Sequence, residues 1–244
     1  MEALILAGGL GTRLRPVIGA DLPKPMVEID GRPFLEYLLR QLRRQGCTRI
    51  SLLVGHGADA IGDYFGDGST LGVRLRYSDE REPLGTAGAI RQAARTLPGR
   101  RFIVMNGDSF VDFSLASLLA CHEAARGEGG AEATLTLVHV SDSGRYGAVE
   151  VGDDGRVRRF HEKDPAAGAG LISAGVYVIE RSLIDDVPDG LAVSLEREIW
   201  PLYLDGRIAS YVTRGIFTDI GVPDTLAQVR ADPAALRQVA RGGS

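Results

Sequence analysis

The sequence predicts an α/β protein with a mixed, mostly parallel sheet flanked by helices. An apolar strand that begins at Ala3 runs directly into a glycine-rich turn. Strand-like and helix-like segments then alternate through the first half of the chain, up to about residue 130. This alternation is typical of a parallel sheet, because neighbouring parallel strands need a crossover that is usually a helix. We expect a single domain over residues 1–235, whose second half, about 131–235, consists mainly of shorter strands.

The first half of the chain carries clear helix signals. Phe34, Leu35, Leu38 and Leu42 recur at helical spacing, and Gly46 is a plausible stop. Ser114 is a residue type that caps helix N-termini. We expect strands over 49–54, 73–77 and 102–106, and helices over 58–65, 86–97 and 114–125.

The second half of the chain contains more strands than helices. Asp153-Asp154-Gly155 predicts a hairpin turn, Asp224 is the expected cap of a closing helix, and Pro233 should interrupt or restart that helix. We expect strands over 133–140, 147–151, 157–160, 171–179, 208–212 and 216–219, a helix over 195–204, and a frayed tail over 236–244. No six-residue repeat of a β-helix is present, so no C-terminal β-helix is expected.

Composition excludes several classes of function. The 244 residues are 44% hydrophobic and 25% charged, which is ordinary for a globular protein. The net charge is −4 and the basic residues form no long run, which argues against nucleic-acid and membrane partners. A core strand that begins at Ala3 leaves no room for a secretory signal, and Cys47 and Cys121 have no metal-ligand spacing. We therefore expect a cytoplasmic protein with reduced thiols.

The glycine-rich turn predicts a phosphate site. Gly8, Gly9 and Gly11 carry no side chains, so main-chain N–H groups can approach a phosphate closely. Arg13 and Lys24 supply the positive charge that a polyphosphate requires. The glycines alone would also suit a solvated hairpin, but together with the cations they predict a nucleoside-triphosphate site.

Two familiar phosphate loops do not fit this turn. The Rossmann pattern needs a third glycine where this chain has Leu14, and no Gly-Lys-Ser/Thr of a Walker loop follows. Lys24 stands between Pro23 and Pro25, whose rings restrict the local backbone. A fixed backbone at Lys24 favours a placed cation over a surface lysine.

Two carboxylates follow predicted strands. Asp108 comes after the strand over 102–106, and Asp219 ends the strand over 216–219. Ligands of open α/β sheets bind beyond the carboxyl ends of strands. Either aspartate alone could be an ordinary turn residue, but two such carboxylates suit Mg²⁺, which takes few protein ligands and adds phosphate oxygens.

Several motifs in order give the chain a family resemblance. They are Leu-Ala-Gly-Gly-Leu-Gly-Thr-Arg-Leu-Arg-Pro at 6–16, Pro-Lys-Pro at 23–25, Leu-Gly-Thr-Ala-Gly-Ala at 84–89, Asn-Gly-Asp at 106–108, Tyr-Gly at 146–147, Glu-Lys at 162–163, Ser-Ala-Gly at 173–175 and Phe-Thr-Asp-Ile-Gly at 217–221. This set, which covers residues 3 to about 229, resembles the sugar nucleotidyltransferases. The resemblance implies a Rossmann-like fold of the nucleotide-diphospho-sugar transferase type, with a nucleotide-binding half over 1–130 and a sugar-binding half over 131–235. Val17 replaces a threonine of many members, which is a minor departure.

The resemblance also implies a reaction. A sugar 1-phosphate attacks the α-phosphorus of a nucleoside triphosphate, and pyrophosphate leaves. Arg13 would then neutralise the pyrophosphate, Lys24 would contact the α-phosphate, and Lys163 would contact the sugar phosphate. Asp108 and Asp219 would hold Mg²⁺.

The binding residues carried over from the family fall into two sets. The expected nucleotide contacts are Leu6, Ala7, Gly8, Gly9, Gly11, Thr12, Glu80, Gly85, Thr86 and Gly88, and the loop over 84–89 offers backbone N–H groups to the base or ribose. The expected sugar contacts are Asn106, Tyr146, Gly147, Glu162, Lys163, Ser173 and Gly175. Lys163 has an alternative reading as an exposed hairpin lysine paired with Glu162, worth ~0–1 kcal/mol. Ser173 stands where family members usually have asparagine, and it reaches less far.

Glu80 indicates guanine as the base. Guanine presents an N1–H and an amino group side by side, so one carboxylate can accept both hydrogen bonds. Thymine and uracil present an imide N–H between carbonyls, which an amide matches better. Glu80 lies in the region where the family reads the base, although loop glutamates are often merely exposed.

Four short sequence segments indicate a particular group within this family. Residues 64–68, 82–86, 194–197 and 217–221 look most like the D-glycero-α-D-manno-heptose 1-phosphate guanylyltransferases. The expected substrates are therefore GTP and that sugar phosphate, and a homo-oligomer is compatible with the sequence. One alternative is a mannose- or other hexose-1-phosphate nucleotidylyltransferase. A second is a non-catalytic nucleotide-sugar-binding regulatory protein, which should have lost Arg13, Lys24 or a metal carboxylate.

Overall fold

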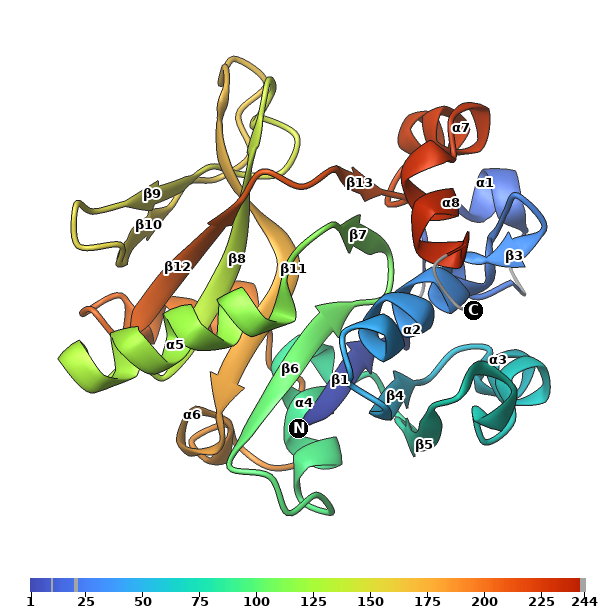
Figure 1. The fold of residues 1–244 in the computed structure, drawn as a ribbon, viewed down its shortest axis with the longest axis horizontal. Helices are drawn as coiled ribbons and strands as arrows, with labels where there is room; N and C mark the ends of the chain where they lie inside the picture. Colours follow the sequence, from blue (N-terminus) through green and yellow to red (C-terminus); the bar gives the residue numbers. More distant parts are fainter. Residues whose placement is uncertain (10, 20–21, 242–244) are drawn as a thin grey trace.

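A seven-stranded sheet forms the centre of the computed structural model, which describes residues 1–9, 11–19 and 22–241 (Figure 1). The strand order is β12-β8-β11-β6-β1-β4-β5. The strands are β1 (Glu2–Leu6), β4 (Arg49–Val54), β5 (Arg74–Asp79), β6 (Arg101–Asn106), β8 (Ala133–Val140), β11 (Gly170–Glu180) and β12 (Ile208–Thr213). All pairings are parallel except those of β11, which runs antiparallel to both β6 and β8. The expected mixed, mostly parallel sheet is confirmed.

The order of the strands places a ligand site beside β1. The chain leaves β1 toward β4 on one side and later returns to β6 on the other. The carboxyl ends of β1 and β6 stay joined, because the Gly107 N–H donates to the Leu6 carbonyl at 2.9 Å. Open α/β sheets bind ligands at such a switch in strand order. The glycine-rich turn follows β1 and Asp108 follows β6, so both lie at this switch in strand order.

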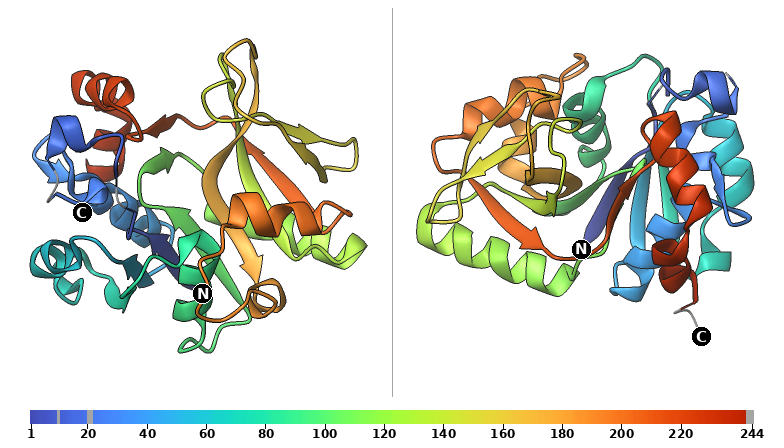
Figure 2. Two further views of the ribbon diagram at one scale, coloured as in Figure 1. Left: turned by 180° about the vertical axis from the view of Figure 1, so that it is seen from behind. Right: turned by 90° about the horizontal axis from the view of Figure 1, so that it is seen from above.

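Helices cover both faces of the sheet. Ala3 and Ile5 of β1 point into one core and Leu4 into the other, as the two-residue period of a strand requires. The helices α2 (Phe34–Arg44) and α5 (Leu115–Gly129) contribute to the first core, and α4 (Gly85–Ala94) and α6 (Arg181–Asp185) contribute to the second. Figure 2 shows this layering from above. The first half of the chain also contains the helices α1 (Arg15–Ile18) and α3 (Ala58–Phe65).

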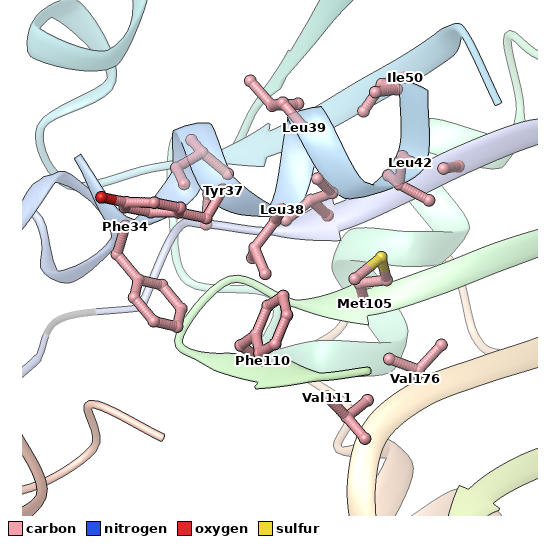
Figure 3. Close-up of a cluster of buried hydrophobic side chains, with 14 of the residues drawn as sticks. Phe34, Tyr37, Leu38, Leu39, Leu42, Ile50, Met105, Phe110, Val111 and Val176 are labelled. Atoms are coloured by element: carbon pink, nitrogen blue, oxygen red, sulfur yellow. The ribbon is translucent and has the colours of Figure 1, made fainter. Parts of the chain in front are cut away.

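The core under α2 fixes the backbone that follows Asp108. Leu38 and Leu42 of α2 lie over Phe110 and Met105, and all four side chains are fully buried (Figure 3). Each such burial contributes about 1.5–3 kcal/mol. Phe110 belongs to the short strand β7 (Ser109–Val111), so this packing anchors the chain directly after the aspartate.

Strand β7 is an element that the sequence does not predict. It pairs antiparallel with β13 (Phe217–Asp219), and Asp219 lies opposite Ser109. The other small sheets are the hairpins of β9 (Val149–Val151) with β10 (Val157–Phe160) and of β2 (Glu28–Ile29) with β3 (Arg32–Pro33). The β7–β13 pair brings two distant parts of the chain to one edge of the site.

The helix predicted over 195–204 takes a different form. Its first turn is a π-helix (Leu195–Ile199), and a 3₁₀ turn (Trp200–Tyr203) follows. Pro201 has no N–H to donate, so a regular α-helix cannot continue through it. Ser114 does cap α5, since its Oγ accepts the Ser117 N–H at 3.2 Å.

The C-terminal helices correct two expectations. Asp224 lies within the first turn of α7 (Pro223–Ala231), whose cap is Val222 without a side-chain hydrogen bond, because Pro223 occupies the first helical position that prolines favour. Residues 236–241 of the expected frayed tail belong instead to α8 (Ala234–Arg241), which follows Pro233 as predicted. Leu236 is buried against the core, and Arg237 pairs with Asp30 at 2.8 Å. Residues 242–244 of that tail lie outside the described residues.

None of the helices in the described part of the chain has the length and apolar character needed to cross a bilayer.

Candidate active site

Two cavities adjoin each other at the switch between β1 and β6. The smaller has a volume of about 300 Å³ and the larger about 500 Å³. Asn106 and Asp108 line both of them. These two residues can therefore contact a ligand in either cavity.

The smaller cavity is formed by the glycine-rich turn and the start of α4. Most of the expected nucleotide contacts line it, namely Leu6, Ala7, Gly8, Gly9, Gly11, Glu80, Gly85 and Thr86. Thr12 and Gly88 are not among its lining residues. The N–H groups of Ala87 and Gly88 donate to the Val193 carbonyl, at 2.9 and 3.3 Å, so they are not offered to a ligand.

Glu80 is held against the glycine-rich turn. A Cβ added to Gly8 would lie 2.9 Å from the Glu80 Oε1, so a side chain at this position would push the carboxylate away from the turn. The Leu84 N–H donates to the other carboxylate oxygen at 3.0 Å. Burial raises the pKa of Glu80 above its ordinary value. The side chain is thus a fixed acceptor in the wall of the smaller cavity.

Lys24 and Asp108 form an ion pair at the junction of the cavities. The Lys24 Nζ lies 2.6 Å from the Asp108 Oδ2, and the side chains are 13% and 34% exposed. Lys24 begins a 3₁₀ turn (Lys24–Met26) in which Pro25 and Met26 are buried. The packed prolines therefore hold the lysine toward the aspartate.

Asp219 reaches the same junction through β13. The Ile220 N–H donates to the Asp108 carbonyl at 2.9 Å, which ties the two aspartates together. The carboxylate of Asp219 accepts from the Gly221 N–H at 2.7 Å and from the Tyr146 hydroxyl at 2.6 Å. Burial, and then the bond to Asp219, raises the pKa of Tyr146, so that hydroxyl keeps its proton and acts as the donor.

The two aspartates suit a divalent cation. Among the described residues, no group of three or more His, Cys, Asp or Glu side chains could enclose a metal ion. Asp108 directly precedes β7, and Asp219 ends β13, which pairs with β7. Both aspartates line the larger cavity, and both are partly exposed. Such a pair fits a cation that completes its shell with water and phosphate oxygens.

The larger cavity contains the expected sugar contacts. Asn106, Tyr146, Gly147, Glu162, Lys163, Ser173 and Gly175 all line it. Arg13 lines this cavity as well, beside Asp108 and Asp219. Within the described residues, Glu162 and Lys163 are both exposed, as the alternative of a hairpin lysine expects, but they form no ion pair with each other.

A β-bulge shapes the floor of the larger cavity. The register between β11 and β8 shifts between Ser173 and Tyr177, and Gly175 has a φ of +74°. A Cβ at Gly175 would lie 2.9 Å from the Asn106 Nδ2, so the glycine leaves room for the asparagine side chain beside β11. The Asn106 Oδ1 is buried, and no described residue forms a hydrogen bond with it. It is an acceptor that a ligand could satisfy.

Several lining residues are not among those predicted. Arg145, Tyr177, Glu196 and Arg197 also line the larger cavity. Glu196 and Arg197 belong to the segment 194–197, which the resemblance singles out without giving it a role. Trp200 is 2% exposed and lines the cavity too.

Comparison with known proteins decides the family. The model of the family described as nucleotidyl transferase matches residues 2–235. The chain belongs to this family. The predicted resemblance is therefore confirmed, and the protein is a nucleotidyltransferase.

Individual relatives of this nucleotidyltransferase include two kinds of guanylyltransferase. The mannose-1-phosphate guanylyltransferase of Mycobacterium tuberculosis is 38% identical over 95% of this chain, which spans 64% of that protein. The D-glycero-α-D-manno-heptose 1-phosphate guanylyltransferase of Campylobacter jejuni is 36% identical over 92% of this chain and 96% of its own length.

Solved structures agree with the fold of this nucleotidyltransferase. The crystal structure of HddC from Yersinia pseudotuberculosis complexed with GMP-PN matches 94% of this chain and 98% of its own, with 33% identity and a TM-score of 0.82. A putative glucose-1-phosphate thymidylyltransferase from Bacillus anthracis has a TM-score of 0.80 at 21% identity, which indicates a shared fold.

Proposed function

We propose that this nucleotidyltransferase transfers GMP from GTP to D-glycero-α-D-manno-heptose 1-phosphate, with GDP-heptose and pyrophosphate as products. The observation that carries the proposal is the position of Asp108, which lines both cavities and holds Lys24 at their junction. One cavity takes the nucleotide and the other the sugar phosphate. The phosphates that react then meet beside one carboxylate and one ammonium group.

The transfer is an in-line displacement at phosphorus. An oxygen of the sugar phosphate forms a bond to the α-phosphorus of GTP, the bond from that phosphorus to the bridging oxygen breaks, and pyrophosphate leaves with the electron pair. Such reactions depend on positioning and charge neutralisation more than on covalent help from the protein. Lys24 stabilises charge on the α-phosphate, Lys163 holds the sugar phosphate, and Arg13 receives the pyrophosphate.

Asp108 and Asp219 would hold Mg²⁺, which supplies charge neutralisation at the phosphates when it is bound. Tyr146 and Gly221 keep the Asp219 carboxylate in place by donating to both of its oxygens. Lys24 is already drawn to Asp108 at 2.6 Å, so it needs only to shift its ammonium group toward an arriving phosphate.

Glu80 supports guanine as the base. Its carboxylate is fixed between Gly8 and Leu84 in the wall of the smaller cavity. Two relatives with the heptose activity in their names, from Campylobacter jejuni and Aneurinibacillus thermoaerophilus, match over 92% of this chain. These names also support the heptose substrate. We place the reaction in the cytoplasm, where GTP is available and where the free thiols Cys47 and Cys121 would stay reduced.

A mannose-1-phosphate guanylyltransferase is the second candidate, and the 38% identity to the Mycobacterium tuberculosis enzyme favours it. A non-catalytic regulatory protein is less well supported. Arg13, Lys24, Asp108 and Asp219 are all retained and line the same pair of cavities.

The test is a substrate panel with the purified protein. GTP, ATP, UTP and dTTP are each combined with heptose, mannose and glucose 1-phosphates in the presence of Mg²⁺, pyrophosphate release is followed, and the product is identified by mass spectrometry. We expect GDP-heptose as the main product. A preference for mannose 1-phosphate would support the second candidate, and equal use of all four nucleotides would remove the assignment of guanine.

A further inference from the structure

The segment 193–197 is docked on the start of α4. The Val193 N–H donates to the Leu84 carbonyl at 2.8 Å, and the Val193 carbonyl accepts from Ala87 and Gly88. A Cβ at Gly85 would lie 2.5 Å from that carbonyl oxygen. The contact leaves no space for a side chain, so the segment has a fixed position relative to the smaller cavity.

Thr86 and Ser194 fix the carboxylate of Glu196. The Thr86 Oγ1 accepts the Leu195 N–H at 2.8 Å and donates to the Glu196 Oε2 at 2.9 Å. The Ser194 hydroxyl donates to the same oxygen at 3.0 Å. The single hydroxyl proton of Thr86 is therefore committed to Glu196 rather than free for a nucleotide.

The second oxygen of Glu196 has a different environment. Glu196 lines the larger cavity, and no residue in the described part of the chain donates a hydrogen bond to its Oε1. Burial raises the pKa of Tyr177, and the negative charge of Glu196 raises it further. The Glu196 carboxylate therefore interacts electrostatically with the Tyr177 hydroxyl at the cavity floor. The Asn106 Oδ1 is a second acceptor without a partner in this cavity.

Glu196 and the paired aspartates reach the cavity from opposite faces of the sheet. Trp200, which continues the segment of Glu196, belongs to the core under α4, whereas Phe217 beside Asp219 packs against the core under α2. When the phosphate of a sugar 1-phosphate lies near Asp108 and Asp219, its sugar ring extends toward the other walls of the larger cavity, which include Glu196. The hydroxyl groups of the ring are the hydrogen-bond donors that can reach this carboxylate.

We propose that Glu196 is a sugar-binding residue that accepts hydrogen bonds from hydroxyl groups of the sugar 1-phosphate, and that Thr86 and Ser194 are positioning residues for its carboxylate. This inference rests on the proposed function and adds a specificity residue to it. A carboxylate held on one oxygen by two hydroxyls and open on the other recognises a donor at a defined place.

Steady-state kinetics of Glu196→Ala test the first part. The KM for the sugar 1-phosphate should rise about 10- to 100-fold, because hydrogen bonds to a charged group are lost, while the KM for GTP stays within about twofold. The matched control is Glu198→Gln, since Glu198 belongs to the same π-helical turn but accepts from the Ser194 N–H at 2.7 Å and does not line the cavity. The control should keep the parent KM values.

Thr86 variants test the positioning role. Thr86→Val removes the hydroxyl at nearly constant volume and should raise the KM for the sugar phosphate about three- to tenfold. Thr86→Ser keeps the hydroxyl and should restore the parent value. A purely structural role for Thr86 would instead change the KM values of both substrates together.

Deoxy analogues of the sugar 1-phosphate give a readout independent of mutant folding. Removal of a hydroxyl that Glu196 binds should cost the parent protein about tenfold or more in kcat/KM and should cost Glu196→Ala little further. Equal losses in both proteins for every analogue, or a parent KM in Glu196→Ala, would overturn this inference alone. A parent protein that transfers no nucleotide to any sugar phosphate would overturn the proposed function as well.

Discussion

The Lys24 Nζ lies 2.6 Å from the Asp108 Oδ2, although the residues are separated by 84 positions in the chain. The contact joins the turn that follows the glycine-rich loop to the end of β6. It places a cation beside the carboxylate that faces both cavities. In the free protein each charge is compensated by the other, and an incoming phosphate competes with Asp108 for the ammonium group.

Replacing either member of this pair should abolish most activity. Lys24→Ala and Asp108→Asn are each expected to lower kcat about 10²- to 10³-fold, because a preorganised charge at the reacting phosphate is lost. Pyrophosphate release under saturating substrates measures the effect. Arg95→Ala is the control, since Arg95 pairs with Asp189 on the exposed surface away from the site. Parent activity in Asp108→Asn would contradict the assigned role.

Tyr146→Phe should weaken the response to Mg²⁺. The variant keeps the ring that packs edge-on against Phe217 but loses the hydroxyl that donates to Asp219. Loss of a hydrogen bond that orients a metal ligand typically costs 10–100-fold in metal affinity. A titration of Mg²⁺ by calorimetry in the presence of GTP checks this shift. An unchanged affinity would show that Tyr146 acts only on the sugar.

Glu80→Gln should change the base preference. An amide cannot accept both guanine N–H groups, so kcat/KM for GTP should fall about 10- to 100-fold. The values for UTP and dTTP should fall less or rise. Competition between GTP and UTP in one reaction, read by mass spectrometry of the products, gives the ratio directly. An unaltered ratio would place base recognition elsewhere.

The same variant should be more stable than the parent in the absence of ligand. Burial raises the pKa of Glu80, so the folded protein binds this proton more tightly than the unfolded chain does. The ionised carboxylate therefore destabilises the fold at neutral pH. This destabilisation decreases as the pH falls below the folded-state pKa of Glu80 and is gone below the ordinary pKa that the carboxyl has in the unfolded chain. Denaturant unfolding at a series of pH values should show a difference in the free energy of unfolding between the two proteins at pH 7, and this difference should vanish in acid. A difference that does not change with pH would mean that ionisation of Glu80 is not its cause.

Leu38→Ala should destabilise the fold, although Leu38 lines neither of the two cavities. Leu38 is fully buried where α2 packs on the sheet, and truncation of such a residue costs about 2–5 kcal/mol. Leu202→Ala removes the same atoms at a position that is 66% exposed and should stay within about 0.5 kcal/mol of the parent. Urea unfolding monitored by circular dichroism distinguishes the two.

Local sequence signals predict the regular elements well. The helix over 58–65 has the expected bounds, and Ser114 caps α5 as its residue type suggests. The strands β4 and β8 also have the expected bounds. These elements follow from periodicity and capping, which depend on neighbours in the chain.

Elements that depend on distant partners are not predicted. Strand β7 has three residues and exists because β13 pairs with it. The contact of Val193 with the start of α4 likewise joins segments that are more than a hundred residues apart. For the same reason sequence motifs predict the candidate acids and cations, whereas the position of Glu196 in the larger cavity is seen only in the folded structure.

The long antiparallel strand β11 is shared by the two halves of the molecule. Its residues pair with β6 on one edge and with β8 on the other. A hinge motion that separated the two halves along β11 would have to break these hydrogen bonds. We therefore expect substrates to enter and products to leave without any change in the order or pairing of the central strands.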